Sequence, residues 1–138
     1  MQRDASGLQV LTRGECLDLL RTAQIGRIVF TDRALPAVQP VNYCLYGEHI
    51  VIRTAGDSRL AAATRRSVVA FETDEFDPGE RTGWSVMAVG HARASLEPEE
   101  RARLARLPLS PWTSGGDHYI VVAIEMLSGR RITAALTS

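Results

Sequence analysis

A short segment that begins at Arg53, with the sequence RTAGDSRL, concentrates groups that can bind an anion. Arg53 and Arg59 carry fixed positive charge and fork-shaped donors that match the geometry of a phosphate. The hydroxyls of Thr54 and Ser58 can donate to phosphate oxygens, and free amides at a helix start favour negative charge. Asp57 is compatible with this site only if its carboxylate points away. A phosphate site and a capped helix with solvated arginines both fit the segment taken alone.

A second candidate lies in the sequence PVNY, which begins at Pro40. Because proline cannot donate to a strand ladder, the strand is predicted to be an edge, to be bulged or to face a ligand at this point. Exposed backbone groups and the Asn42 amide can bind a flat heteroaromatic ring, and Val41 and Tyr43 can cover its faces. The alternative is an edge strand whose tyrosine packs in the core.

Trp84 is the third candidate, because it is an aromatic side chain next to Gly83 at the start of a long predicted strand. Taken alone, it is better explained as a core or dimer-interface tryptophan. His49, His91 and His118 lie on separate predicted strands. The sequence contains no HExxH, paired CxxC or GxSxG motif, so we predict neither a metal site nor a catalytic triad.

The composition favours a single globular domain over residues 1–138, with residues 1–10 as a tail. All sixteen basic residues are arginine, and sixteen acidic residues balance them. Without a basic surplus, binding to nucleic acid or to an anionic membrane is not expected. No apolar run approaches the roughly 20 residues of a membrane span, and no signal peptide is visible, so we expect a soluble cytoplasmic protein. Cys16 and Cys44 are expected to be reduced.

The elements that must position these residues are mostly strands. Thr12 and Glu15 form a capping box that opens a helix, which should end near Gly26. Short helices are predicted at 59–66 and from residue 98, with loops at 74–82 and 108–117. Strands are predicted at 27–31, 37–46, 49–54, 67–73, 83–96 and 118–127, with a further short one at 132–136. This order lacks βαβ alternation and predicts a small six-stranded antiparallel Greek-key barrel with helices on its rim.

The order of these segments resembles the pyridoxamine 5′-phosphate oxidase-like FMN-binding split barrels. The similarity rests on a capped helix followed by a strand and then by QPVNY, IRTAGDSRL, VVAFETDEF and GWSVMAVGHA, and it covers roughly residues 10–127. The chain is most similar to the small group of nitroimidazole-resistance-like and general flavin-binding proteins. Family members usually carry lysine where this chain has Arg59, which keeps the charge. The chain is also expected to lack the C-terminal segment that binds the vitamin-B6 substrate.

The resemblance implies a homodimer with two FMN sites at the subunit interface. It implies that the isoalloxazine lies along Val41, Asn42 and Tyr43, and that the phosphate is held by Thr54, Ser58 and Arg59 with Arg53 close by. It also implies that Trp84 and Ser85 reach the cofactor of the other subunit.

The function implied is that of a flavin-dependent oxidoreductase, which takes electrons from a reduced nicotinamide or flavin and acts on a small organic substrate. A cofactor can carry the redox chemistry, so no catalytic triad is required. A non-catalytic FMN carrier or sensor would need the same phosphate segment. A deazaflavin coenzyme on the same barrel is a further alternative, whereas haem would require an axial ligand that no histidine is placed to supply.

Overall fold

The computed structural model describes residues 2–109 and 116–133. These residues form eight strands and three helices. In chain order they are β1 (Gln9–Val10), α1 (Arg13–Thr22), β2 (Ile25–Asp32), β3 (Leu35–Tyr46), β4 (His49–Thr54), α2 (Arg59–Ala63), β5 (Ser67–Asp77), β6 (Thr82–Ala94), α3 (Pro98–Leu104), β7 (His118–Ala123) and β8 (Met126–Ile132).

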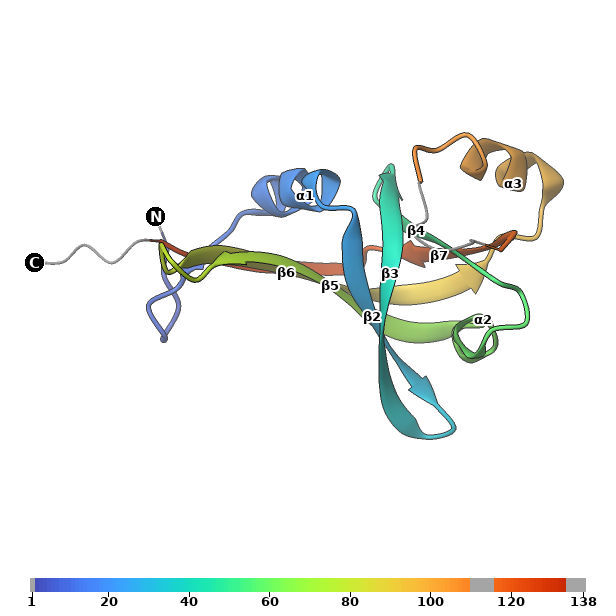
Figure 1. The fold of residues 1–138 in the computed structure, drawn as a ribbon, viewed down its shortest axis with the longest axis horizontal. Coiled ribbons are helices and arrows are strands. Elements are labelled where there is room, and N and C mark those ends of the chain that lie inside the picture. Colours follow the sequence, from blue (N-terminus) through green and yellow to red (C-terminus); the bar gives the residue numbers. More distant parts are fainter. Residues whose placement is uncertain (1, 110–115, 134–138) are drawn as a thin grey trace, which may run out of the picture.

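Six of the strands close into a barrel. The order β6-β5-β2-β3-β4-β7 is antiparallel at every step, and a further β6–β7 pairing closes the ring. The predicted six-stranded antiparallel barrel is therefore confirmed. The other part of β6 pairs with β8, and β8 pairs with β1, so the sheet continues beyond the barrel as an arm. Figure 1 shows α1 over this arm and α2 and α3 at the opposite end.

The core follows from the alternation of side chains along the strands. Apolar residues at every second position face the barrel interior, and α1 packs against the same core. The core contains large, fully buried side chains from the strands and from two helices, namely Ile28, Ile50, Ile52, Phe71, Val86, Ile120 and Val122 together with Leu20 of α1 and Leu60 of α2. A second, smaller cluster lies outside the barrel under α3 and comprises Val51, Leu104, Tyr119 and Val121.

Helix α1 begins as predicted and ends earlier. The Glu15 amide donates to Thr12 Oγ1 over 3.2 Å, and the Thr12 amide donates to Glu15 Oε1 over 2.9 Å, so the capping box is confirmed. The helix ends at Thr22, and Gly26 belongs to β2. A Cβ at Gly26 would lie 2.1 Å from the Phe71 ring, so this glycine makes room for a core aromatic and does not end a helix.

The C-terminal strands differ from the prediction. The segment predicted as one strand at 118–127 is two strands, because the chain turns at Ile124 and Glu125 and changes its position along β6. A Cβ at Gly90 would lie 1.6 Å from the Ala123 carbonyl oxygen, so only glycine allows this close crossing. The last strand is β8, whereas residues 134–136 of the predicted strand 132–136 lie outside the described residues. The predicted loop at 74–82 is also mostly strand.

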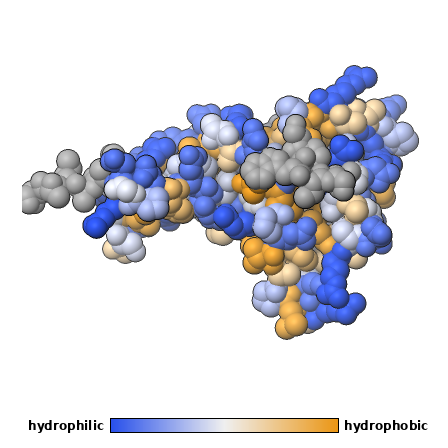
Figure 2. Space-filling view, in the orientation of Figure 1, coloured by the Kyte–Doolittle hydropathy of each residue, from blue (hydrophilic) through white to orange (hydrophobic). Residues whose placement is uncertain are grey.

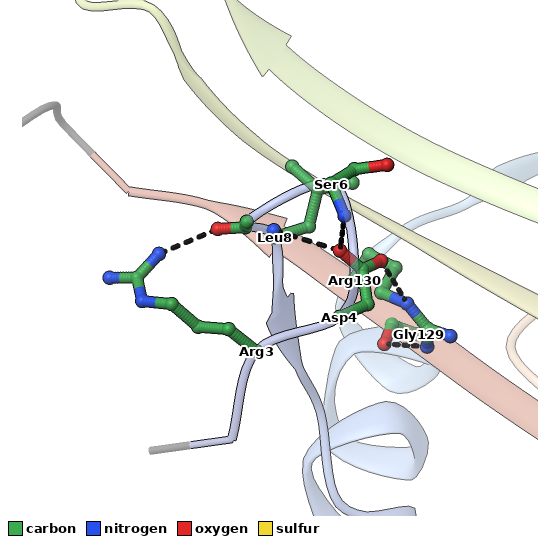
Figure 3. Close-up of polar contacts among 7 residues, drawn as sticks. Arg3, Asp4, Ser6, Leu8, Gly129 and Arg130 are labelled. Carbon is green, nitrogen blue, oxygen red and sulfur yellow. Dashed lines mark hydrogen bonds and ion pairs between the residues drawn. The ribbon is translucent and has the colours of Figure 1, made fainter.

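The N-terminal segment, predicted as a tail, is fastened to β8. The carboxylate of Asp4 accepts hydrogen bonds from the Ser6 and Leu8 amides and from Arg130 on β8, at 2.9–3.0 Å (Figure 3). These donors lower the pKa of Asp4, with the Leu8 amide contributing most. Strand β1 comes directly after this turn in the sequence and pairs with β8.

Candidate functional site

Strands β3 and β4 separate at Tyr43 and Ile52. Their ladder runs from the Tyr46–His49 pair to the Tyr43–Ile52 pair. Beyond this point β3 pairs only with β2, among the described residues, while β4 continues along β7 as far as Thr54. One backbone edge of β3 therefore has no strand beside it from residue 41 back to residue 35, among the described residues. We call this opening the β3–β4 split.

Pro40 lies on this open edge. Its partner on β2 is Arg27, and the register of the β2–β3 ladder is continuous on both sides of it. The strand is therefore an edge at this point without a bulge, which is one of the three predicted possibilities. A proline is tolerated here because its missing N–H removes no ladder bond on the side where β3 is unpaired.

Thr54 and Ser58 lie together at the far side of the split. Their hydroxyl oxygens are 3.2 Å apart, and the Ser58 hydroxyl also accepts from the Ala61 amide over 3.0 Å. The Ser58 amide donates to the Ala55 carbonyl over 3.1 Å, which closes a tight turn between β4 and α2. Each hydroxyl carries one proton, and the hydrogen bond between the two oxygens requires only one of these two protons. The other can be donated to a further acceptor.

The two arginines of this region differ in how they are engaged. Arg53 donates to the Gly116 carbonyl, and its guanidinium lies 5.8 Å from the centre of the Tyr119 ring. Arg59 is 72% exposed and contacts Asp32 Oδ2 over 3.2 Å. Arg59 is therefore the arginine whose side chain can reorient to contact a ligand. Arg53 instead joins β4 to the segment at Gly116 and to Tyr119. We call Arg53, Thr54, Ser58 and Arg59 the phosphate corner.

His118 lies behind the phosphate corner, in register with Thr54. Its Nε2 is buried and has no hydrogen-bond partner among residues 2–109 and 116–133. Burial lowers the pKa of His118, so the ring is neutral at neutral pH. A Cβ at Gly116 would lie 2.4 Å from Ala55 Cα, so this segment packs directly on the backbone of the turn. A buried polar atom without a partner fits a site that is completed by a polar ligand.

No pattern in the sequence assigns His118 to a binding site. The signal that singles it out is the β4–β7 register, which sets it opposite Thr54 although the two residues are far apart in the chain. Asp57, which the prediction required to point outward, is exposed.

The side chains of Val41 and Tyr43 point into the core, which corrects the expectation that they cover a bound ring. Tyr43 is 3% exposed, donates to the Leu20 carbonyl over 2.6 Å and packs edge-on against Phe71. Burial raises the pKa of Tyr43 to about 12. At these two positions only the backbone remains for a ligand.

Asn42 has the opposite orientation, as expected for the residue between two inward-facing ones. It lines a small cavity of about 70 Å³ together with Gln24, Tyr43, Pro108 and Leu109. A larger groove of about 420 Å³ shares Gln24, Tyr43 and Pro108 with this cavity and extends along the end of α1. The Asn42 side chain therefore lies beside open space at the point where the split begins.

Trp84 and Ser85 lie at the other end of β6. Trp84 pairs with Glu75 and Arg131 and lines a cavity of about 630 Å³ at the tip of the arm. Ten residues of strand, roughly 33 Å, separate it from Ala94 at the end of β6 that pairs with β7. A single chain does not bring these two residues to the phosphate corner.

The face of the sheet that points away from the barrel interior and α1 is rich in exposed apolar side chains. We call it the outer face. Val38, Val29, Ala70, Val89 and Met126 follow one another across five strands in register. Six of the large exposed hydrophobic residues lie on this face, namely Val38, Val68, Phe76, Met87, Met126 and Ile132. Figure 2 shows hydrophobic surface on the hairpin of β2 and β3 and next to it.

The fold and the site define an antiparallel split barrel in which two arginines and two hydroxyls gather beside an open strand edge. The family model described as pyridoxamine 5′-phosphate oxidase matches residues 12–131, and the chain belongs to this family. This confirms the resemblance inferred from the sequence.

Similar proteins agree with this assignment. The chain is 40% identical over 130 residues to the uncharacterized protein Rv0080 of Mycobacterium tuberculosis, covering 90% of this chain and 85% of that protein. A solved structure of an FAD-binding protein from Mycobacterium smegmatis is 32% identical, with a TM-score of 0.79 over 90% of this chain and 98% of the other. An FAD-binding protein from Mesorhizobium loti shares the fold at 20% identity, with a TM-score of 0.77 over 91% and 99% of the two chains.

Proposed function

We propose that this chain binds a flavin nucleotide in the β3–β4 split. The phosphate lies at the phosphate corner, and the isoalloxazine lies along the open edge of β3 beside Asn42. The observation that carries this proposal is the separation of β3 from β4 at Tyr43 and Ile52, because it leaves a strand edge open next to two hydroxyls and an exposed guanidinium. The name of the relative from Mycobacterium smegmatis, an FAD-binding protein, supports it.

The residues of the corner have separate roles in this proposal. The free hydroxyl proton of the Thr54–Ser58 pair donates to a phosphate oxygen, and Arg59 supplies a charge-assisted bond. Arg53 keeps the segment before β7 against the turn through its bond to Gly116. His118 gives its unpartnered Nε2 to the ligand or to a water that bridges to it.

The ring contacts come mainly from the backbone. Residues 40 and 41 of β3 offer backbone on the side that faces away from β2, and the Asn42 amide lies beside them. Hydrogen bonds from these groups would tune the reduction potential of the flavin, which supplies the redox chemistry when bound.

The nucleotide was predicted as FMN, whereas the two solved structures named above are of FAD-binding proteins. Both nucleotides present the same riboflavin and the same first phosphate, so the corner serves either one. A deazaflavin coenzyme also carries a phosphate and stays an alternative. The spectrum of the bound ligand distinguishes the flavins from the deazaflavin.

We further propose that the protein is a homodimer in which the outer face of each subunit is covered by the other subunit. The row of apolar side chains across five strands supports a protein contact. In this arrangement Trp84 and Ser85 of one subunit complete the cofactor site of the other, as the family resemblance implies. The large distance along β6 between Trp84 and the barrel end supports a contribution across subunits rather than within one chain.

The activity that follows is a flavin-dependent oxidoreduction on a small organic substrate, with a reduced nicotinamide as electron donor. A carrier or sensor of flavin is the second candidate. Tyr43 and His91 are two side chains that could act as a general acid. The carrier or sensor is favoured because Tyr43 is buried in the core and His91 is held by Glu125 at 2.7 Å on the outer face. Anaerobic addition of NADH or NADPH separates the two, since only the oxidoreductase loses the colour of its bound flavin within seconds to minutes.

Flavin binding is tested by titrating the purified full chain with FMN, FAD and riboflavin while recording the visible spectrum and the flavin fluorescence. Arg59→Ala and Ser58→Ala should each weaken binding of FMN and FAD by about tenfold, and riboflavin much less, since a charge-assisted bond contributes about 1.5–3 kcal/mol. Arg21→Ala is the matched control, because Arg21 is an exposed arginine in an ion pair on α1. A colourless chain that retains neither nucleotide would disprove the proposal. If wild type and Arg59→Ala bind FMN and FAD with equal affinity, the phosphate binds at another place in the protein.

A further inference from the structure

The ion pair between Arg59 and Asp32 joins the phosphate corner to the end of the β2–β3 hairpin. Arg59 Nη1 lies 3.2 Å from Asp32 Oδ2, and the two side chains are 72% and 23% exposed. The contact links the first residue of α2 to the last residue of β2. The exposed arginine that offers positive charge to a ligand is therefore already beside a carboxylate.

Asp32 is held more firmly than its partner. It pairs with Leu35 across a two-residue turn, in which Arg33 and Ala34 have φ values of 53° and 68°. Two successive positive φ angles are typical of the tight hairpin turn that matches strand twist. The carboxylate therefore stays near the corner when Arg59 moves, and a phosphate bound by Arg59 has a fixed negative charge as a neighbour.

The repulsion depends on the charge of the phosphate. The terminal phosphomonoester of FMN has a second pKa near 6, so it carries close to two negative charges at neutral pH. The first phosphate of FAD is part of a diphosphate diester and carries one. The second negative charge of FAD lies farther away, on the next phosphate. Moving one charge from roughly 6 Å to roughly 9 Å from a carboxylate changes affinity about 1.5-fold in bulk water and about fivefold at the effective dielectric of a protein surface, so about threefold is expected.

We propose that Asp32 is a specificity residue of the flavin site, which disfavours the phosphomonoester of FMN relative to the diphosphate of FAD. This inference rests on the proposed function, because it requires a flavin phosphate at the phosphate corner. It makes Asp32 a negative counterpart of Arg59, which supplies attraction to both nucleotides. The ion pair itself is exposed and is broken at little cost when a phosphate replaces the carboxylate.

The test is the ratio of FMN to FAD affinity in the full-length protein, measured with Asp32→Asn and, as a second variant, Asp32→Ser. Both variants should raise the ratio about threefold. Loss of the ion pair also frees Arg59, which changes the ratio in the same direction, and the affinity for riboflavin, which has no phosphate, should stay constant. Asp18→Asn is the matched control, because it removes a carboxylate from an exposed ion pair with Arg21 on α1.

The possible outcomes separate the two proposals. If wild type binds both nucleotides and neither Asp32 variant changes the ratio, the role of Asp32 is disproved while flavin binding stands. The role is also disproved if riboflavin affinity changes by the same factor as FMN affinity, because Asp32 would then act on the shape of the split. If wild type binds none of the three flavins, both proposals fail.

Discussion

The hydroxyl of Tyr43 donates a 2.6 Å hydrogen bond to the backbone carbonyl of Leu20, inside the core. Tyr43 also forms, with Ile52, the β3–β4 pair that lies next to the split and farthest from the hairpin turn. The bond therefore ties the start of the split to α1. The ring packs edge-on against Phe71 with 4.6 Å between ring centres, so the inner side of β3 is held while its outer edge is open.

Tyr43→Phe should lower the free energy of unfolding by about 1–2 kcal/mol, because it leaves the Leu20 carbonyl buried without its donor. The measurement is urea denaturation of wild type and variant, with Tyr46→Phe, a change at a more exposed tyrosine, as the control. Flavin affinity should change less than about twofold, since the ring faces the core. A large loss of flavin affinity with unchanged stability would instead assign the hydroxyl to the binding site.

The carboxylates of Glu72 and Asp74 share one nitrogen of Arg27, at 3.0 and 3.2 Å. Burial, together with the neighbouring Asp74, raises the pKa of Glu72 from 4.5 to about 7. The folded state therefore binds this proton more tightly than the unfolded state, and the stabilisation present below pH 4.5 is lost as the pH rises through about 7.

Replacing Glu72 with Gln should consequently raise the melting temperature at pH 8 and have little effect at pH 4.5. Thermal unfolding at the two pH values measures this, with Glu99→Gln as the control at an exposed position on α3. An equal shift at both pH values would show that the carboxyl group of Glu72 does not titrate in this range.

Gly90→Ala should destabilise the chain strongly, because the new Cβ would lie 1.6 Å from the Ala123 carbonyl oxygen, a backbone atom. We expect a loss of about 3 kcal/mol or a failure to fold. Gly14→Ala on α1 is the control, since nothing lies within 4 Å of its added Cβ, and it should be neutral or slightly stabilising. Normal stability of Gly90→Ala would mean that the chain between β7 and β8 lies farther from Gly90 than in this structure.

Met126→Glu should dissociate the proposed homodimer, because it sets a charge at the end of the apolar row on the outer face. Sedimentation at micromolar concentration should give a dimer for wild type and a monomer for the variant. Leu96→Glu is the matched control, as Leu96 is the most exposed of the large hydrophobic residues and lies outside the row. A monomeric wild type would refute the dimer, and a dimeric Met126→Glu protein would locate the interface on another surface.

Features that depend on neighbours along the chain could be predicted well. The capping box of Thr12 and Glu15 joins residues three positions apart, and β4 has the predicted bounds because Gly47 and Glu48 form a short hairpin link. The proximity of Thr54 and Ser58 also follows from a local turn. The division between β7 and β8 was missed because it depends on Gly90 in a distant strand.

The sequence by itself determined the order of the elements, the family and the segment that can hold a phosphate, since these depend on motifs of a few consecutive residues. Only the tertiary structure decided which side of each strand faces the core. It turned Tyr43 into the core, set the unpartnered His118 opposite Thr54 and brought Asp32 to Arg59. The physical reason is register, because the pairing of distant strands selects the face of every side chain, and no local pattern encodes that choice.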